Sequence, residues 1–243
     1  MKQSVLEYKK LLEQEGLLVE FAEPEGKEGE DRPVTLVTYF SGGADQGTLF
    51  LCKGAAFKEA YLKDAVNRGA VAYVSEKKYE AGKEIPALIV NDARKAQFVL
   101  GEAFYDYPAK SLHVTALTGT KGKTTTTYMV KSILENAGYK VGLIGTIEAI
   151  IGDKVIPAKN TTPESYVIQE YFHEMAEAGC DCVVMEVSSQ GLMLHRTQGF
   201  VFDFGIFTNI EPDHIGPNEH KDFDDYLRCK SLLLKQCKVG IVN

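Results

Sequence analysis

One stretch, HVTALTGTKGKTTTTYMVKSILENAG at residues 113–138, constrains the fold more than any other part of the chain. It combines an apolar strand pattern, a short loop of glycine, threonine and lysine, and a helical pattern that ends at Gly138. Glycine lets a loop backbone approach an anion closely, and the helix that follows directs its first N–H groups toward that anion. The order strand, loop, helix therefore predicts a phosphate-binding loop in an α/β domain.

The side chains of this loop suit a nucleoside triphosphate. Lys123 can reach the terminal phosphates, and the Thr124 hydroxyl can bind Mg²⁺. The standard spacing of such loops requires a glycine where this chain has Leu117, so the match is to a shortened form. The alternative is a glycine-rich turn with solvated lysines, and the flanking strand and helix favour phosphate binding. The residues expected to bind the nucleotide here are Gly119, Thr120, Lys121, Gly122, Lys123, Thr124 and Thr125.

Strands and helices alternate along the rest of the chain, which predicts an α/β fold with two domains. We expect a small first domain at residues 1–109, and a second domain with a mainly parallel sheet at residues 110–243, because YDYPAKS (105–111) is typical of a boundary. The apolar runs CDCVVMEVSS, FDFGIFTNI and KVGIVN predict strands buried on both faces. Pro163 is expected to open a helix that runs to Gly179. Since the chain stops directly after a strand, we expect a truncated protein.

Composition excludes several classes of protein. The 243 residues carry a net charge of -7, which argues against a general nucleic-acid or anionic-membrane binder. No apolar run approaches the roughly 18 residues that span a membrane, and the polar N-terminus is unlike a signal peptide. Five scattered cysteines are unlike a disulfide framework. We expect a cytoplasmic monomer with free thiols that acts on small molecules.

Two further candidates follow apolar strands. Glu186 ends the run CVVME, and the carboxyl ends of strands in an open α/β sheet face the ligand crevice. A carboxylate there could bind Mg²⁺ beside Thr124, or could instead serve as a capping or ion-paired glutamate. His214 follows the run at 202–210 and adjoins Asp213, which favours a site over a structural histidine. We expect His220 to be solvated or structural.

These motifs together resemble the Mur ligase family. TGTKGKTTT is similar to the ATP loop of that family and of the related folylpolyglutamate synthetases. The segments NTTPES (160–165), MEVSSQGL (185–192), FTNIEPDHIGPNEH (207–220) and YLRCKSLL (226–233) follow in the order of the branch that adds the third amino acid to the muramoyl peptide. The resemblance covers nearly the whole chain and is strongest from about residue 110 onward. GTLFLCKG and NRGAVAYVSE resemble the family's UDP-binding domain.

The resemblance assigns roles to individual residues. It makes Lys123, Glu186, His214 and Lys230 catalytic, with metal ligands from Thr124, Glu186, His214 and a carbamylated Lys230. Without the resemblance, Lys230 would be interpreted as a surface lysine. Asn209 joins the nucleotide site, and the residues implied in substrate binding are Ser41, Asn160, Thr161, Thr162, Ser188 and Arg196.

The chain also departs from the family pattern. Gln190 stands where the family usually has histidine, and Phe40-Ser41-Gly42 stands where it often has Asp-Ser-Arg. These departures affect the polar contacts expected around the substrate. A second family contact region corresponds to Ala55, Ala56 and Phe57.

The implied activity is an ATP- and Mg²⁺-dependent ligation. ATP would phosphorylate the D-Glu carboxylate of UDP-MurNAc-L-Ala-D-Glu, and the amine of L-lysine or meso-diaminopimelate would displace phosphate to form an amide. We expect the 243 residues alone to be inactive. Two alternatives stay open: a sibling ligase such as a folylpolyglutamate synthetase, and a nucleotide-binding module that does not ligate.

Overall fold

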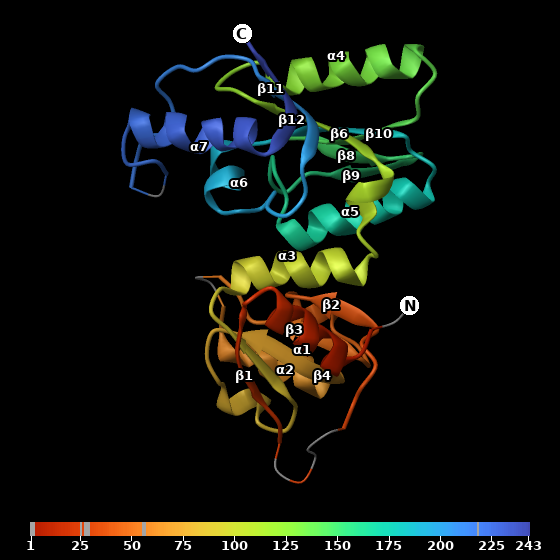
Figure 1. Cartoon of the computed structure of the whole chain (residues 1–243), viewed down its shortest axis with the longest axis vertical. Helices are drawn as coiled ribbons and strands as arrows, with labels where there is room; N and C mark the ends of the chain where they lie inside the picture. The colour runs from red at the N-terminus through yellow and green to blue at the C-terminus, as the bar shows by residue number, and fades with distance from the viewer. Residues whose placement is uncertain (1–2, 25, 27–29, 55–56, 218) are drawn as a thin grey trace. The chain divides into compact units, whose positions relative to one another are not determined.

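The computed structural model describes residues 3–24, 26, 30–54, 57–217 and 219–243 (Figure 1). The chain divides into two compact units, Met1–Asp106 and Tyr107–Asn243. At the division, Asp106 and Tyr107 both adopt left-handed backbone angles, with φ of 58° and 56°. Among the described residues, no helix combines the length and apolar character needed to cross a membrane.

The first unit has a five-stranded sheet in the order β1-β5-β4-β3-β2. Its strands are parallel except for β1, which pairs antiparallel with β5. Phe50, Leu62 and Tyr73 lie in its core. The strands are β1 (Leu18–Ala22), β2 (Leu36–Thr38), β3 (Thr48–Leu51), β4 (Ala70–Ser75) and β5 (Ala87–Val90), with helices α1 (Val5–Gln14), α2 (Glu59–Asn67) and α3 (Ala93–Phe104) and 3₁₀ turns η1 (Ser41–Gly43) and η2 (Glu80–Gly82). The Asp92 side chain caps α3 by accepting from the N–H groups of Arg94 and Lys95.

The second unit has a seven-stranded sheet in the order β12-β11-β6-β10-β7-β8-β9. The first five of these strands are parallel, and β8 and β9 pair antiparallel, so the expected mainly parallel sheet is confirmed. The strands are β6 (His113–Thr118), β7 (Val141–Ile144), β8 (Glu148–Ile151), β9 (Lys154–Pro157), β10 (Cys182–Glu186), β11 (Phe202–Phe207) and β12 (Cys237–Val242), with helices α4 (Lys123–Asn136), α5 (Ser165–Glu177), α6 (Ser189–Met193) and α7 (Phe223–Lys235) and the turn η3 (Pro108–Ser111).

Helices cover both faces of this sheet. On one face Val130 and Leu134 of α4 pack with Ile206 of β11 against the core cluster. Gly205, the neighbour of Ile206, points to the opposite face, where it meets Leu233 of α7. Figure 1 shows α4 on one side of the sheet and α5 on the other. Because β6, β7, β10 and β11 are parallel, the loops that follow them meet at one edge.

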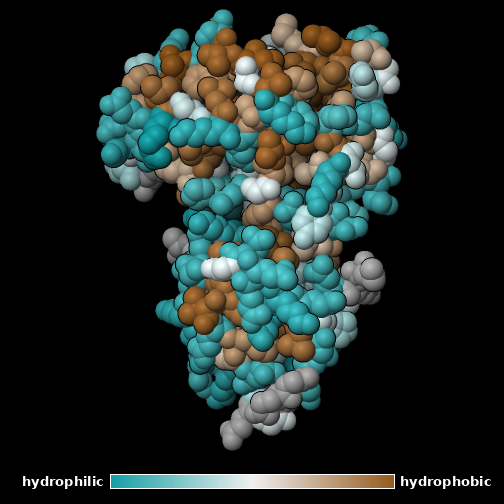
Figure 2. Space-filling view, in the orientation of Figure 1, coloured by the Kyte–Doolittle hydropathy of each residue, from teal (hydrophilic) through white to brown (hydrophobic). Residues whose placement is uncertain are grey.

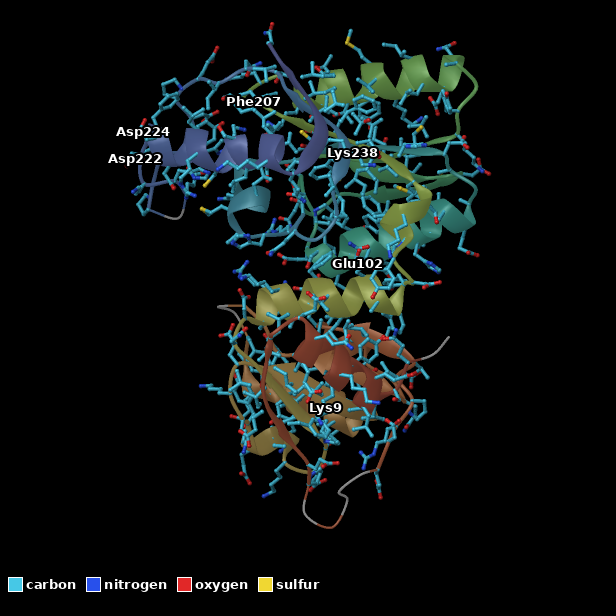
Figure 3. The ribbon with its side chains drawn as sticks, in the orientation of Figure 1. Lys9, Glu102, Phe207, Asp222, Asp224 and Lys238 are labelled. Carbon is cyan, nitrogen blue, oxygen red and sulfur yellow. The ribbon has the colours of Figure 1, made fainter. Side chains whose placement is uncertain are left out.

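Helix α7 has a strongly acidic start. Asp222 caps it by accepting from the N–H of Asp225, and Asp224 adds negative charge in the first turn, as labelled in Figure 3. Acidic side chains stabilise this end of a helix by interacting with its dipole. Shortly after the end of this helix, Lys238 of β12 pairs with Asp203 of β11 at 2.7 Å.

The structure corrects two expectations about the second unit. Helix α5 begins at Ser165 after its N-cap Glu164, so Pro163 precedes the helix. Strand β12 is an edge strand with Val239 and Ile241 49% and 47% exposed, and Phe204 of β11 is 43% exposed, so neither strand is buried on both faces. Figure 2 shows hydrophobic residues at the surface of this unit, where α4 and β12 lie. All five cysteines are free thiols.

Candidate active site

The loop between β6 and α4 has a conformation that only glycine permits at its first position. Gly119 has φ of 155° and Gly122 has φ of 78°. A Cβ atom on Gly119 would lie 2.0 Å from Thr208 Oγ1, which is far inside contact distance. The loop therefore packs closely against the segment that follows β11. The sequence does not predict this contact, because the two segments are far apart along the chain.

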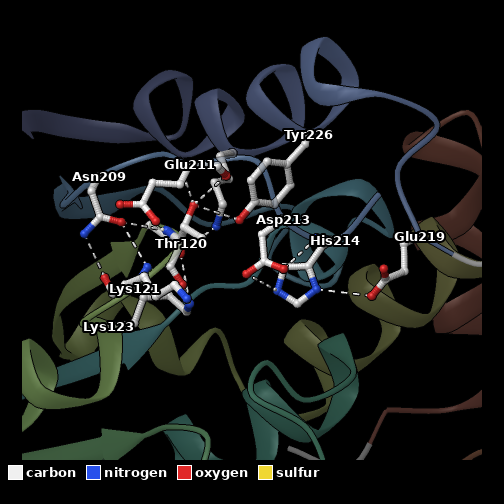
Figure 4. A network of polar contacts seen from close by, with 11 residues as sticks. Thr120, Lys121, Lys123, Asn209, Glu211, Asp213, His214, Glu219 and Tyr226 are labelled. Atoms are coloured by element: carbon white, nitrogen blue, oxygen red, sulfur yellow. Dashed lines mark hydrogen bonds and ion pairs between the residues drawn. The ribbon is translucent and has the colours of Figure 1, made fainter. Parts of the chain in front are cut away.

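Asn209 holds this loop from the side (Figure 4). Its Oδ1 accepts from the N–H groups of Thr120 at 3.1 Å and Lys121 at 2.9 Å, and its Nδ2 donates to Lys121 O at 3.0 Å. These two loop N–H groups are therefore used internally. The first N–H that bonds back within α4 belongs to Thr126, which donates to Gly122 O at 2.9 Å. The earlier N–H groups of this turn are the ones suited to an anion.

Two lysine amines converge on one loop carbonyl. Gly119 O accepts from Lys123 Nζ at 2.9 Å and from Lys230 Nζ at 2.7 Å. Lys230 is 1% exposed, so the interpretation as a surface lysine, made from the residues alone, is wrong. Helix α7 packs this side chain over the loop, with its amine 4.8 Å from the centre of the Tyr226 ring.

The surroundings of these two amines disfavour positive charge. Burial, together with the neighbouring Lys123, lowers the pKa of Lys230 to about 7. Burial also lowers the pKa of Lys123, although the Glu186 carboxylate opposes that change. Desolvation penalises an ammonium group, and a nearby anion would offset that penalty. An anionic ligand bound here would therefore stabilise the charged form of both amines.

Glu186 brings a buried carboxylate to the loop. Its Oε2 accepts from the hydroxyls of Thr124 and Thr146 at 3.0 Å each, and its Oε1 accepts from the N–H of Thr146 at 2.9 Å. The Glu186 side chain is fully buried. Thr146 was missed by the sequence reasoning, although it follows the strand β7, and the rule that strand ends face the crevice would have indicated it.

A second group of polar residues, from the segments before α5 and after β10, lies next to Glu186. The Ser188 N–H donates to Thr162 Oγ1 at 2.9 Å, and Arg196 donates to Thr162 O at 3.0 Å. Arg196 also pairs with Glu164 at 3.0 Å, so part of its charge is already balanced. Thr161 Oγ1 lies 3.1 Å from the Thr146 hydroxyl. These contacts hold residues 160–162 in a bent segment before α5, which explains why the helix begins later than expected.

Lys123, at the start of α4, borders one cavity of about 360 Å³ together with several of these polar residues. It is lined by Lys123, Thr146, Lys159, Asn160, Thr161, Thr162, Ser188, Ser189, Gln190, Arg196, His214 and Lys230. The structure thus places half of the predicted second-unit residues around a single cavity. Lys159 and Ser189 were not singled out from the sequence. Thr125 is exposed on α4 and does not line the cavity.

The two histidines of the loop after β11 have different environments. His214 is 48% exposed and borders the cavity, and its Nδ1 lies 3.2 Å from Glu219 Oε1. His220 is fully buried, with Nδ1 3.2 Å from Asp225 Oδ2, so it is structural and not solvated. The ligand atoms of His220, Asp225 and Cys229 lie close enough together to hold a metal ion. The Arg228 guanidinium, 2.6 Å from Asp225 Oδ1, already balances the negative charge of Asp225.

The predicted first-unit residue is placed at the start of η1. Ser41 is half-buried and bonds to Asp64. Hydrogen bonds from Arg68 and then from Ser41 hold the pKa of Asp64 below its usual value. Ala55 and Ala56, in the second expected contact region, lie outside the described residues.

Comparison with known proteins gives consistent matches. The sequence profile of the Mur ligase middle domain matches residues 117–243. A UDP-N-acetylmuramyl-tripeptide synthetase of Ligilactobacillus salivarius is 47% identical over 214 residues, which cover 85% of this chain and 41% of that protein. A UDP-N-acetylmuramoyl-L-alanyl-D-glutamate–L-lysine ligase of Enterococcus faecalis is 43% identical over 241 residues, or 96% of this chain and 47% of that protein.

Solved structures share the fold. A UDP-N-acetylmuramoyl-L-alanyl-D-glutamate–2,6-diaminopimelate ligase superposes with a TM-score of 0.73 at 23% identity, covering 87% of this chain and 43% of its own. MurF from Acinetobacter baumannii superposes with a TM-score of 0.64 at 22% identity, covering 97% and 48%. This chain therefore spans less than half the length of each of these proteins.

Proposed function

The chain belongs to the Mur ligase family, and from this premise we propose that it forms the substrate- and nucleotide-binding part of an ATP-dependent ligase of peptidoglycan precursor synthesis. The acceptor would be UDP-MurNAc-L-Ala-D-Glu, and the added residue a diamino acid, L-lysine or meso-diaminopimelate. A cytoplasmic monomer is proposed, since free thiols suit a reducing compartment.

The observation that carries this proposal is the convergence of charged groups on the loop. Two lysine amines meet at Gly119 O, and the Glu186 carboxylate meets the Thr124 hydroxyl. Phosphoryl transfer to a carboxylate demands cations around the transferred group and a fixed metal position. A glycine-rich turn without a ligand would gain nothing from a buried and a partly buried lysine on one carbonyl, because their mutual repulsion is destabilising.

The nucleotide would bind at the start of α4. The N–H groups of Lys123, Thr124 and Thr125 would donate to the phosphates, while Thr120 and Lys121 would fix the loop shape through Asn209. Lys123 would leave Gly119 O for the terminal phosphate and stabilise the negative charge of the transferred group. ATP then phosphorylates the D-Glu carboxylate to an acyl phosphate, and the incoming amine displaces phosphate as the amide forms.

The residues present suit Mg²⁺. Thr124 and Glu186 offer hard oxygen atoms 3.0 Å apart, and oxygen is the donor that Mg²⁺ prefers. Glu186 and Thr124 would hold one ion, and His214 and a modified Lys230 would hold a second. When bound, these ions would neutralise phosphate charge and orient the acceptor carboxylate. Thr146 would keep Glu186 in place through its two hydrogen bonds.

Lys230 is proposed to act as a carbamate. Its neutral amine would attack CO₂, forming an N–C bond while one C=O π pair becomes an oxyanion, and the amine would release one proton. The lowered pKa of Lys230 supports this step, because only the unprotonated amine is nucleophilic. The product would be an anion that offers two oxygen ligands.

The remaining cavity residues would bind the muramoyl substrate. Arg196 and Ser188 suit its phosphate-bearing end, because the arginine fork matches phosphate oxygens. Asn160, Thr161 and Thr162 would contact the muramoyl portion, and Ser41 the uridine diphosphate end. Residues 1–109 would then serve as the UDP-binding domain and residues 110–243 as the ATP-binding domain.

Calorimetric titration of the purified chain with the β,γ-imido analogue of ATP and Mg²⁺ tests this proposal. Lys123→Ala should abolish binding, while Lys131→Ala on the same helix should leave it unchanged. Equal affinity in both variants would remove Lys123 from the site. A thermal-shift comparison of UDP-MurNAc-L-Ala-D-Glu with a folate would separate this ligase from a folylpolyglutamate synthetase, and stabilisation by the folate alone would refute the assignment.

A further inference from the structure

Helix α7 contacts the nucleotide loop through two side chains one turn apart. The Lys230 amine donates to Gly119 O at 2.7 Å, and the Tyr226 hydroxyl lies 3.1 Å from Thr120 Oγ1. Residues four apart share one face of a helix, so both side chains reach the loop from the same side. The helix is thus tied to two consecutive loop residues.

The Thr120 hydroxyl also contacts the backbone of Glu211. Thr120 Oγ1 accepts from the Glu211 N–H at 3.0 Å and lies 3.3 Å from Glu211 O (Figure 4). A hydroxyl has one proton to donate and two lone pairs to accept with. Either hydroxyl can donate in the bond between Thr120 and Tyr226, and removal of the Tyr226 hydroxyl breaks that bond in both cases.

We propose that Tyr226 is a positioning residue of the nucleotide loop, whose hydroxyl keeps Thr120 fixed against α7 when Lys230 leaves Gly119 O. The inference rests on the proposed function, in which Lys230 gives up that carbonyl to become a metal ligand. Once Lys230 has moved away, the hydrogen bond between Tyr226 and Thr120 is the polar contact that remains between α7 and loop residues 119–122, among the residues that the structure describes.

The phenol ring can be separated from its hydroxyl by substitution. The ring packs 5.2 Å from the His220 ring and 4.8 Å from the Lys230 amine. Tyr226→Phe keeps these contacts and removes only the hydroxyl. Tyr128→Phe is a matched control, because the Tyr128 hydroxyl also forms a hydrogen bond, of 2.7 Å to Glu148, from the helix that follows the loop.

Amide hydrogen exchange in the nucleotide-free chain, followed by NMR, tests the hold on the loop. The N–H groups of Thr120 and Lys121 bond to Asn209 and report loop position. Loss of one buried hydrogen bond should accelerate their exchange about fivefold in Tyr226→Phe, and Tyr128→Phe should leave it unchanged. In a Thr120→Val background, Tyr226→Phe should add no further acceleration. Equal exchange in the wild type and Tyr226→Phe would overturn the inference.

Nucleotide titration distinguishes this inference from the proposed function. Tyr226→Phe should raise the Kd of the β,γ-imido ATP analogue about three- to tenfold, while Lys123→Ala abolishes binding. Unchanged affinity in Tyr226→Phe, with binding lost in Lys123→Ala, would overturn the positioning role alone. Unchanged affinity in both variants, with faster exchange in Tyr226→Phe, would refute nucleotide binding at Lys123 and leave the hold on the loop standing.

Discussion

Replacing Lys230 with methionine should remove a rise in stability that the wild-type chain shows above pH 7. Lys230 is 1% exposed, and its pKa falls from 10.5 in the unfolded chain to about 7 in the folded chain. Between these values, the unfolded chain holds a proton that the folded chain has released, so the free energy of unfolding rises with pH. Below pH 7 both states are protonated and above pH 10.5 neither is, so the contribution is flat outside this interval.

The size of the effect follows from the same two pKa values. One pH unit corresponds to about 1.4 kcal/mol, so the free energy of unfolding should gain about 3 kcal/mol between pH 7 and pH 9.5. Methionine has a similar length and no charge, so this gain should be absent in Lys230→Met. The variant should also be more stable than the wild type at pH 7, although it loses the bond to Gly119 O.

Urea unfolding followed by circular dichroism at several pH values from 7 to 9.5 would measure this difference. Buffers must be free of CO₂, because a carbamate would remove the titrating amine. Lys238→Met is the control, since the Lys238 side chain is 66% exposed and should keep the wild-type pH dependence. Parallel stability curves for the wild type and Lys230→Met would refute the argument from burial.

Other substitutions test other parts of the site and core. Gly119→Ala should abolish binding of an ATP analogue in calorimetry, because its Cβ would lie 2.0 Å from Thr208 Oγ1, and retained affinity would contradict this steric argument. Glu186→Gln should raise the Mg²⁺ concentration needed for nucleotide binding at least tenfold (about 1.4 kcal/mol); an unchanged requirement in a Mg²⁺ titration would remove Glu186 from the metal site. Phe172→Ala should lower the free energy of unfolding by about 3–5 kcal/mol in urea titrations, since the fully buried ring packs 5.1 Å from the Phe200 ring; a loss under 1 kcal/mol would count against this packing.

The local order of elements around the loop could be predicted from the sequence because it depends on short-range patterns. Apolar strands, the glycines and the helix from Lys123 are all local signals, and the structure has them in the expected order. The same holds for Asp92 as the cap of α3, since a helix cap acts within three residues. Glu186 at a strand end is also a local prediction, and its bond to Thr124 follows once the strands are parallel.

Features that depend on distant contacts could not be predicted in this way. Lys230 shares the apolar face of α7 with Tyr226 and Leu233, but a lone lysine is usually solvated, and the packing of α7 on a loop 111 residues earlier buries it. The Asn209 side chain fixes the loop by hydrogen bonding, and no rule based on sequence spacing predicts this contact. The hairpin of β8 and β9 was missed, although Gly152-Asp153 between two short apolar runs is a recognised turn signal. The exposure of β12 follows from its edge position, which depends on strand order.

The central claim is that nucleotide phosphates bind at the first turn of α4. Backbone amide NMR of the ¹⁵N-labelled chain during titration with the β,γ-imido ATP analogue and Mg²⁺ tests it most directly. The amides of Gly122, Lys123, Thr124 and Thr125 should show the largest chemical-shift changes, and the Lys123→Ala chain should show none at the same concentrations. Largest changes in the first unit, or unchanged amides at 122–125 under saturating nucleotide, would contradict the account.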